Sequence, residues 1–569
     1  MKISKKIAAT AIGLAFMGSA AYAQSLDDAK TAINAEQYQK AKSMLTNLTV
    51  TQSTKDENYF YLGWVYLKQD EPDSAKLWFN KGLAVNPKSS LNYVGLGAVA
   101  RLNKDQAGAL SNFNTALANA AKKDSKPYVF IGKSYLLTAV PGAPVAAADA
   151  QAAVDVLTKG AAVNPKDDEL LIARGDAEAS QLKNNDAYTD YAAALDVNPK
   201  SAAASVAQGV LLKFANNYDD ARTDFQNALK IDPNFGPAYR EWAETDLREA
   251  KGDPKVAADK YKSAADEYKK YITLTDYSLQ SQMRYADFLI SDADYTTLQT
   301  VATQLSKSAG TNLRVYRYLG YAAYENKDYA NGLTAMNTWM TKADPNRIIP
   351  RDYLYLGRLQ VAAGQDSIGV ITLQKAYTLD TTQYDVLEEI AKAEYTKKKY
   401  KAAGDEYYLF VSKGKGASLT DLFNEGRSYF FAYQEQFFSK ATPKPVADTT
   451  LLIRADTAFS KVQQKALHPV ADVALFRART NDYREPDRNT TLGLAKPFYE
   501  NYIDLVLAKG IPQDDRSKSG LAEAYDYLGR YYELKAKDDV KASDNYTKAL
   551  TYVPTDAQAL DYQKRKGKK

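Results

Sequence analysis

The chain has 569 residues, with 74 Lys and Arg against 69 Asp and Glu, a single His at position 468 and no Cys. Without cysteine it can form no disulfide, zinc–thiolate site or iron–sulfur cluster, and a lone histidine excludes a multi-histidine metal site. The composition therefore argues against much enzyme chemistry, and we expect no catalytic residue, no metal and no cofactor.

The first 23 residues have the pattern of a secretory signal peptide. A basic segment ends at Lys6, the apolar stretch Ile7–Met17 follows, and small residues up to Ala23 supply a cleavage site before Gln24. The apolar stretch is shorter than the roughly 20 residues that a membrane-spanning helix needs, although a buried helix or membrane anchor is an alternative. We expect a soluble periplasmic protein with no transmembrane segment, and no lipid anchor because no Cys follows the signal.

Beyond the signal, small residues recur at one phase with steps that are often 34 residues. In many units an Ala follows twelve residues later and an apolar or aromatic residue four positions after it, as at Ala75 and Phe79. The small residues stand at Ala29, Gly63, Gly97, Gly132, Gly175, Gly209, Ala243, Ala286, Gly320, Gly357, Ala391, Gly426 and Gly529. A fixed period of this length is the signature of a repeat array.

The clearest unit runs from Asp56 to Ser89. Its first predicted helix carries Tyr59, Leu62, Gly63 and Tyr66 on one face, its second carries Ala75 and Phe79, and Pro87 ends it. This pattern resembles the tetratricopeptide repeat (TPR) family, and the chain as a whole resembles an exported bacterial TPR protein. The resemblance implies an all-α fold, a right-handed α-solenoid of about 13–14 stacked helix–turn–helix units.

We count thirteen units and a weaker fourteenth around 471–509. The predicted domains are a signal peptide (1–23), an N-terminal array of units 1–7 (24–275), a central array of units 8–11 (276–415), C-terminal units with insertions (416–562) and a basic tail (563–569). Insertions at 139–148, 439–450 and 481–491 are expected as loops between helices, either tolerated surface loops or parts of a binding face. The repeats leave no room for a separate catalytic domain, so we expect no enzyme.

Two short motifs imitate nucleotide-binding loops. Residues 95–100 match G-x-G-x-x-A, and Gly132-Lys133-Ser134 resembles the end of a phosphate loop. Both fall inside predicted first helices, whereas the dinucleotide fingerprint needs a preceding strand within a βαβ unit. We therefore expect no nucleotide cofactor.

Arrays resembling this one bind peptides or partner proteins along the concave face that the first helices line. Directly after the small packing residue stand Arg358, Lys392 and Arg427, and Arg530 returns at this phase in the last unit. The remaining candidate contact residues are Arg314, Arg317, Tyr321, Tyr324, Arg351 and, in the N-terminal half, Trp64. Stacking would align the basic residues as a stripe that could receive a carboxylate or another acidic group. The alternative is a solvated face balanced by Asp385, Glu388 and Glu389.

Export and an all-repeat body together favour a non-enzymatic scaffold of the cell envelope that binds other envelope or secreted proteins or peptides. A glycan- or nutrient-capture module is the alternative, and an envelope enzyme is a third hypothesis. Loss of the three N-terminal lysines would leave a net charge of about +2, which gives no reason to expect nucleic-acid binding. The basic tail Lys564–Lys569 is expected to be solvated, with peripheral membrane association as the other reading.

Overall fold

The computed structural model describes residues 25–138, 143–308, 312–413, 416–485, 487 and 490–566. The predicted signal peptide (1–23), the centre of the first insertion and the last three residues of the basic tail lie outside these ranges. Over the described residues every regular element is a helix. The chain divides into two compact units, residues 1–309 and 310–569, and each is described by itself.

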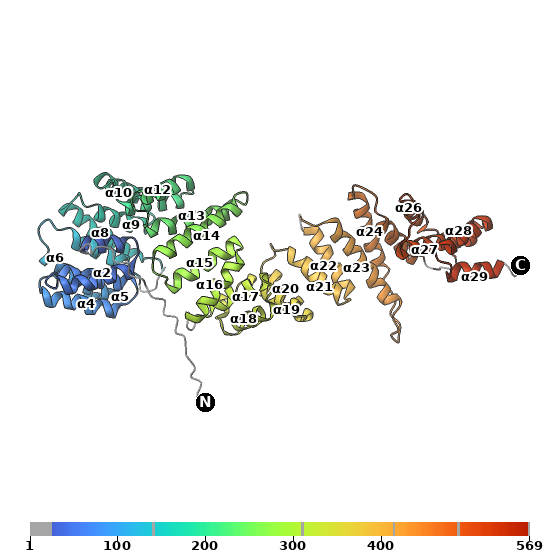
Figure 1. Ribbon diagram of the computed structural model, residues 1–569, viewed down its shortest axis with the longest axis horizontal. Coiled ribbons are helices and arrows are strands. Elements are labelled where there is room, and N and C mark those ends of the chain that lie inside the picture. Colours follow the sequence, from blue (N-terminus) through green and yellow to red (C-terminus); the bar gives the residue numbers. More distant parts are fainter. Residues whose placement is uncertain are drawn as a thin grey trace, which may run out of the picture. The chain divides into compact units, whose positions relative to one another are not determined.

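The first unit contains sixteen helices within its described residues (Figure 1). They are α1 (Leu26–Asn34), α2 (Tyr38–Thr51), α3 (Asp56–Lys68), α4 (Pro72–Val85), α5 (Ser90–Leu102), α6 (Gln106–Asn119), α7 (Lys126–Leu136), α8 (Ala147–Val163), α9 (Asp168–Ala179), α10 (Asn184–Val197), α11 (Ala202–Phe214), α12 (Tyr218–Ile231), α13 (Gly236–Gly252), α14 (Ala257–Leu274), α15 (Leu279–Asp292) and α16 (Tyr295–Ser308).

The second unit continues with the same alternation of helices. They are α17 (Arg314–Glu325), α18 (Tyr329–Lys342), the 3₁₀ turn η1 (Pro345–Arg347), α19 (Pro350–Ala362), α20 (Asp366–Leu379), α21 (Asp385–Thr396), α22 (Tyr400–Lys413), α23 (Leu419–Phe437), α24 (Thr450–Lys465), α25 (Ala471–Tyr483), α26 (Lys496–Leu507), α27 (Asp515–Tyr531), the π-helical turn η2 (Tyr532–Ala536), α28 (Asp539–Tyr552) and α29 (Ala557–Lys566).

Consecutive helices pack as antiparallel hairpins, and within each unit each hairpin packs on the next. The described residues form fourteen such hairpins, from α1/α2 to α27/α28, followed by α29. The predicted fold class, an all-α solenoid of about 13–14 helix–turn–helix units, is confirmed. The weak unit predicted at 471–509 is the hairpin α25/α26.

Small residues at the recurring phase let the two helices of a hairpin approach closely. A Cβ atom added at Gly63 on α3 would lie 2.5 Å from the ring of Phe79 on α4, and one at Gly175 would lie 2.5 Å from Tyr191. Phe79 is fully buried in consequence. The second unit uses the same small–large pairing with aliphatic and aromatic partners, because Gly320 faces Met336 and Gly426 faces Phe459. The matched pair, repeated along the chain, forms the core of each hairpin.

Most hairpins turn through a single residue in the left-handed region. After α3, for example, Asp70 has φ 62° and Pro72 then begins α4. The described residues at this position are Glu36, Asp70, Lys104, Leu182, Asn216, Ala293, Lys327, Gly364, Lys398 and Lys537. Only one of these ten is the glycine that the conformation favours. The four hairpins without the turn are α7/α8, α13/α14, α23/α24 and α25/α26.

The predicted insertions lie where the sequence places them, between the two helices of a hairpin. Residues 137–146 join α7 to α8, 438–449 join α23 to α24, and 484–495 join α25 to α26. The domain boundaries predicted at 275/276 and 415/416 fall between helices and stay predictions. None of the described helices combines the length and apolarity that crossing a bilayer requires.

Hydrogen bonds between distant residues close the first unit upon itself. Glu36, in the turn after α1, accepts from Arg240 on α13 at 2.5 and 2.6 Å and from the hydroxyl of Tyr271 on α14 at 2.8 Å. Asp276, just after α14, accepts from the backbone N–H of Gln39 at 3.0 and 3.1 Å. We call these five residues the clasp. It joins the first hairpin to the seventh, so the first helices between them enclose a lumen.

Candidate peptide-binding groove

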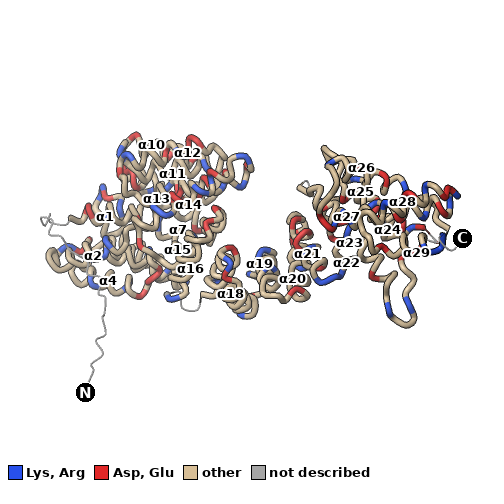
Figure 2. The backbone as a smooth tube through the Cα atoms, turned by 45° about the vertical axis from the view of Figure 1, so that its right-hand side comes forward, with Lys and Arg blue, Asp and Glu red and all other residues tan. Residues whose placement is uncertain are grey.

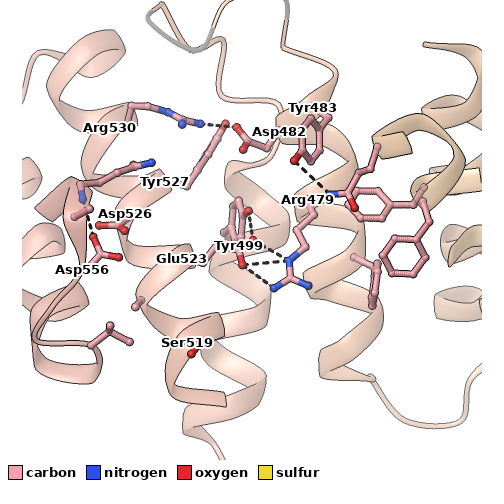
Figure 3. A pocket seen from close by; sticks show the side chains of 18 residues that line it. Arg479, Asp482, Tyr483, Tyr499, Ser519, Glu523, Asp526, Tyr527, Arg530 and Asp556 are labelled. Atoms are coloured by element: carbon pink, nitrogen blue, oxygen red, sulfur yellow. Dashed lines mark hydrogen bonds and ion pairs between the residues drawn. The ribbon is translucent and has the colours of Figure 1, made fainter. Parts of the chain in front are cut away.

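A groove with a cavity volume of about 610 Å³ lies on the first-helix face of the last hairpins. Its walls come from α23, α25 and α27, and the turn before α29 closes one end (Figure 3). The elements are first helices because each carries the small packing residue, as Gly426 does on α23 and Gly529 on α27. A volume of this size is within the range of ligand-binding clefts.

One wall of the groove is aromatic. Phe430 and Phe476 meet edge to face with ring centroids 5.6 Å apart, and Phe431 meets Phe476 at 6.3 Å. Tyr483 packs against Phe430 at 5.9 Å. Edge-to-face packing of this kind holds the rings rigidly, so the wall is a preformed apolar surface.

A polar wall adjoins the aromatic one and is held by ion pairs. Arg479 on α25 binds Glu523 on α27 through contacts of 2.7 to 3.1 Å, and the hydroxyl of Tyr499 donates to the same carboxylate at 2.8 Å. Arg530 forms an ion pair with Asp482. These bonds connect neighbouring first helices across the hairpin boundary, and they fix the width of the groove (Figure 3).

A carboxyl pair lies at the end of the polar wall. Asp526 on α27 is 6% exposed, and its Oδ1 has no hydrogen-bond partner among the described residues. Burial and the neighbouring carboxyl group of Asp556 raise the pKa of Asp526 to about 8. At neutral pH Asp526 is therefore mostly protonated, and an approaching cation would favour its ionisation.

The charges that line the groove are unequal. Four carboxyl groups, at Asp482, Glu523, Asp526 and Asp556, line the groove beside two guanidinium groups, at Arg479 and Arg530. Both guanidinium groups form ion pairs, Arg479 with Glu523 and Arg530 with Asp482, whereas the other two carboxyl groups form no ion pair with any described residue. Elsewhere, basic and acidic residues are interspersed over the helices of each unit (Figure 2).

Two predicted contact residues on α17, Arg317 and Tyr321, bind a buried residue of α19. Arg317 binds Asp352, a fully buried carboxylate, at 2.8 Å, and its guanidinium stacks over the ring of Trp339 at 4.5 Å. Tyr321 is 1% exposed and donates to the same Asp352 at 2.7 Å. Arg317 and Tyr321 are thus brought together, and they bind a residue of the next hairpin.

The other basic candidates also meet partners within the array. Arg358 binds Glu389 at 2.6 Å, and Arg427 donates to the hydroxyl of Tyr395 at 2.8 Å. Lys392 pairs with Glu388 but remains 58% exposed. The pairing of Arg358 and Lys392 with Glu389 and Glu388 is the balance that the sequence offered as the alternative to a binding stripe.

The last four candidates are dispersed. Arg351 is exposed on α19, and the guanidinium of Arg314 lies 5.4 Å from the ring of Tyr318. Tyr324 packs edge to face on Tyr355. Trp64, in the first unit, is 2% exposed, stacks with Phe60 and meets Phe130 edge to face. Trp64 therefore packs in the core of its unit, and partner binding by all nine residues stays a prediction.

Sequence reasoning missed most of the groove. Arg479, Asp482, Glu523 and Asp526 escaped notice because the insertion at 484–495 interrupts the 34-residue period in this part of the chain. Arg530 was found by its phase, directly after Gly529. Within the described residues, no group of three or more His, Asp or Glu side chains could hold a metal ion.

No protein-family model matches the chain, and neither does any curated protein. Solved structures do resemble it. The C-terminal part of a TPR repeat-containing protein from Cytophaga hutchinsonii has 27% identity and a TM-score of 0.34, and the match covers 49% of this chain and 98% of that one. A TPR protein from Thermus thermophilus has 20% identity and a TM-score of 0.29, with 34% and 100% covered. YrrB, a TPR protein with an unusual peptide-binding site, has 18% identity and a TM-score of 0.21, with 34% and 95% covered.

These three similar structures are TPR proteins. The fold of this chain follows from its fourteen hairpins. Fold and groove define a helical-repeat protein whose first helices carry a preformed cleft. The residues that line this cleft include aromatic side chains of α23 and α25 and charged side chains of α25 and α27.

Proposed function

We propose that the chain is a non-enzymatic scaffold that binds a segment of a partner protein in the groove of its last hairpins. The observation that supports this most directly is the aromatic wall near the carboxyl pair of Asp526 and Asp556, which forms no ion pair with a described cation. Such a surface fits a peptide in which Phe, Tyr or Leu adjoins Lys or Arg, because the apolar side chain packs on Phe431 and the cation meets Asp526.

The setting that we propose is the bacterial cell envelope. The basic, apolar and small-residue segments that end at Ala23 support export to the periplasm. The partners would then be other envelope or secreted proteins. The basic stripe belongs to the same proposal as a second contact surface, with Lys392 as its most accessible member.

The groove is tested by fluorescence anisotropy with labelled twelve-residue peptides that contain Lys or Arg next to an aromatic residue. We expect binding to the wild-type chain, and affinities at least tenfold weaker for Asp526→Asn and for Phe431→Ala. The matched control is Asp544→Asn, which changes an exposed carboxylate on α28 outside the groove. Unchanged affinity in both groove variants would exclude this site.

Two further arms separate the alternatives. Peptides with Glu in place of Lys or Arg should bind weakly if the groove is the site, whereas a preference for them that Lys392→Glu abolishes would favour the basic stripe. Retention on a glycan array without any peptide binding would favour glycan capture over the scaffold.

A further inference from the structure

The lumen of the first unit contains a cavity that the groove does not explain. It has a volume of about 340 Å³ and is lined by the first helices α1, α3, α7, α9 and α11. It adjoins a second cavity of about 790 Å³, because Asn34, Ile172, Asp176 and Ala203 line both. The volume of the first cavity suits a small molecule.

Most charged groups that line this first cavity are already paired. Lys133 binds Glu169 at 2.5 Å, and Lys30 binds Asp27 at 3.2 Å. Glu36 belongs to the clasp, where it accepts from Arg240. The two charges of each pair neutralise each other. These pairs account for the shape of the lumen and the closure of the unit, and none of them needs a ligand as a counter-charge.

Two charged side chains of opposite sign in this lining form no ion pair with any described residue. Lys68, at the end of α3, makes no hydrogen bond and no ion pair with any described residue. Asp176 on α9 accepts one hydrogen bond, from the hydroxyl of Tyr191 at 2.8 Å, and has no cationic partner among the described residues. Both side chains are exposed to solvent and line this cavity.

The electrostatics of these two groups agree with their placement. Burial lowers the pKa of Lys68, and the neighbouring Lys133 lowers it further. Burial raises the pKa of Asp176, against the hydrogen bond from Tyr191. Each group thus bears the penalty of an enclosed charge without a counter-charge, and the two feel each other's charge without forming an ion pair.

We propose that the lumen of the first unit binds a small zwitterion of the free α-amino-acid class, with its carboxylate on Lys68 and its ammonium group on Asp176. An aliphatic side chain on this ligand fits against Ile33, Leu136 and Ile172, which line the same cavity and are half-buried. The ligand supplies both missing counter-charges at once, which neither a simple anion nor a simple cation can do. This site is independent of the groove in the second unit.

The test is isothermal titration of the full chain with L-leucine. We expect saturable one-to-one binding, and affinities at least tenfold weaker for N-acetyl-L-leucine, which lacks the ammonium group, and for L-leucinamide, which lacks the carboxylate. Absence of leucine binding at millimolar concentration overturns the proposal. Equal affinity for leucine and for either analogue overturns it as well, because one of the two charges would then have no role.

Variants locate the site. Lys68→Met and Asp176→Asn should each weaken leucine binding at least tenfold, whereas Lys76→Met and Asp155→Asn, which change exposed charges on α4 and α8, should leave it unchanged. Wild-type leucine affinity in both lumen variants overturns the assignment.

A measurement on the wild-type sequence covers the case in which a variant fails to fold. Reductive ¹³C-methylation of the lysines and NMR titration report the pKa of Lys68, whose signal is identified by its absence in Lys68→Arg. Saturating leucine should raise this pKa, because a carboxylate then lies beside the ammonium group. An unchanged pKa in the presence of bound leucine overturns the placement of the carboxylate.

Discussion

The first unit and the last three hairpins of the second unit use the same helical hairpin to make an enclosed surface in different ways. In the first unit, regular hairpins stack until the clasp joins the first to the seventh, and the lumen results from closure. In the last hairpins, α23 is extended to 19 residues and long loops follow α23 and α25, and the groove results from irregularity. In the described residues an enclosed surface thus arises either from closure of the array or from a departure from the repeat.

The largest effect should come from the pairing of a small residue on one helix with a large residue on its partner helix, which we call the small–large lock. Both regions share this pairing. We expect Phe79→Ala to lower the free energy of unfolding of the first unit by about 3–5 kcal/mol, because it leaves a cavity in a fully buried site. Hydrogen exchange measured by mass spectrometry should show lost protection in α3 to α6 and none in the second unit. Leu77→Ala, on the same helix but exposed, is the control.

Breaking the clasp tests whether closure distinguishes the first unit. Glu36→Gln removes the charge that Arg240 binds, and we expect a loss of about 2 kcal/mol, as for other hydrogen bonds to charged groups. Protection should fall at α1 and α2 and equally at α13 and α14, about 200 residues away along the chain. Glu71→Gln, which disturbs a 4.0 Å contact with Lys42 and a local hydrogen bond from Ser74 at 3.2 Å, is the control. A fall confined to the first hairpin would mean that the unit is not closed.

The pH dependence of stability should distinguish the second unit, which contains the groove, from the first. Asp526 has a pKa of about 8 in the folded chain, above the ordinary value for Asp, so the folded state keeps a proton that the unfolded state releases. The contribution of Asp526 to the stability of the second unit should therefore fall by about 2 kcal/mol as the pH rises from 6 to 8, and level off above about pH 9. Glu425, whose pKa burial raises to about 7, acts in the same direction.

Asp526→Asn is the variant that isolates this contribution. It should reduce the slope of stability against pH in the second unit and leave the first unit unchanged, as judged by hydrogen exchange corrected for the intrinsic rate at each pH. A slope that survives at full size would assign the effect to other groups.

The smallest expected effect concerns the left-handed turns. Leu182 has φ 62° and is 84% exposed, so Leu182→Gly relieves backbone strain without loss of packing, and we expect a gain of about 1 kcal/mol. The opposite change in the second unit, Gly364→Ala at φ 76°, should lose a similar amount. Thermal melts of the two variants, measured side by side, check the sign; two changes in the same direction would contradict this account.

The sequence predicted the hairpins well because the determinants are local. The phase of Gly63, Gly97 and their equivalents marks the first helices, and loops at 139–148 and 439–450 fall where the period is broken. The closure of the first unit could not be predicted in this way. The clasp joins residues more than 200 positions apart, and the curvature that brings them together is a sum of small rotations from each repeat.

The candidate residues show a second limit of the sequence. The phase after the packing glycine did identify Arg358 on a first helix, but the partner that binds it, Glu389, lies 31 residues further along. Arg317 and Asp352 are 35 residues apart. A search for opposite charges about one repeat apart would have found both pairs. No such rule would find Lys68 and Asp176, because their placement around one cavity depends on closure of the unit.

The small–large lock has a consequence for how such a chain can gain or lose hairpins. Several hairpins carry both halves of the small–large lock, as with Gly63 and Phe79 or Gly320 and Met336, although Phe79 also faces Gly95 of the next hairpin. A duplicated hairpin would bring its own small–large pair and would need to match its neighbours only at contacts such as that of Phe79 with Gly95. A single substitution does require a compensating change, since a larger residue at the small position needs a smaller residue at the large position. The array should therefore tolerate gain or loss of whole hairpins more readily than substitution at either half of a lock.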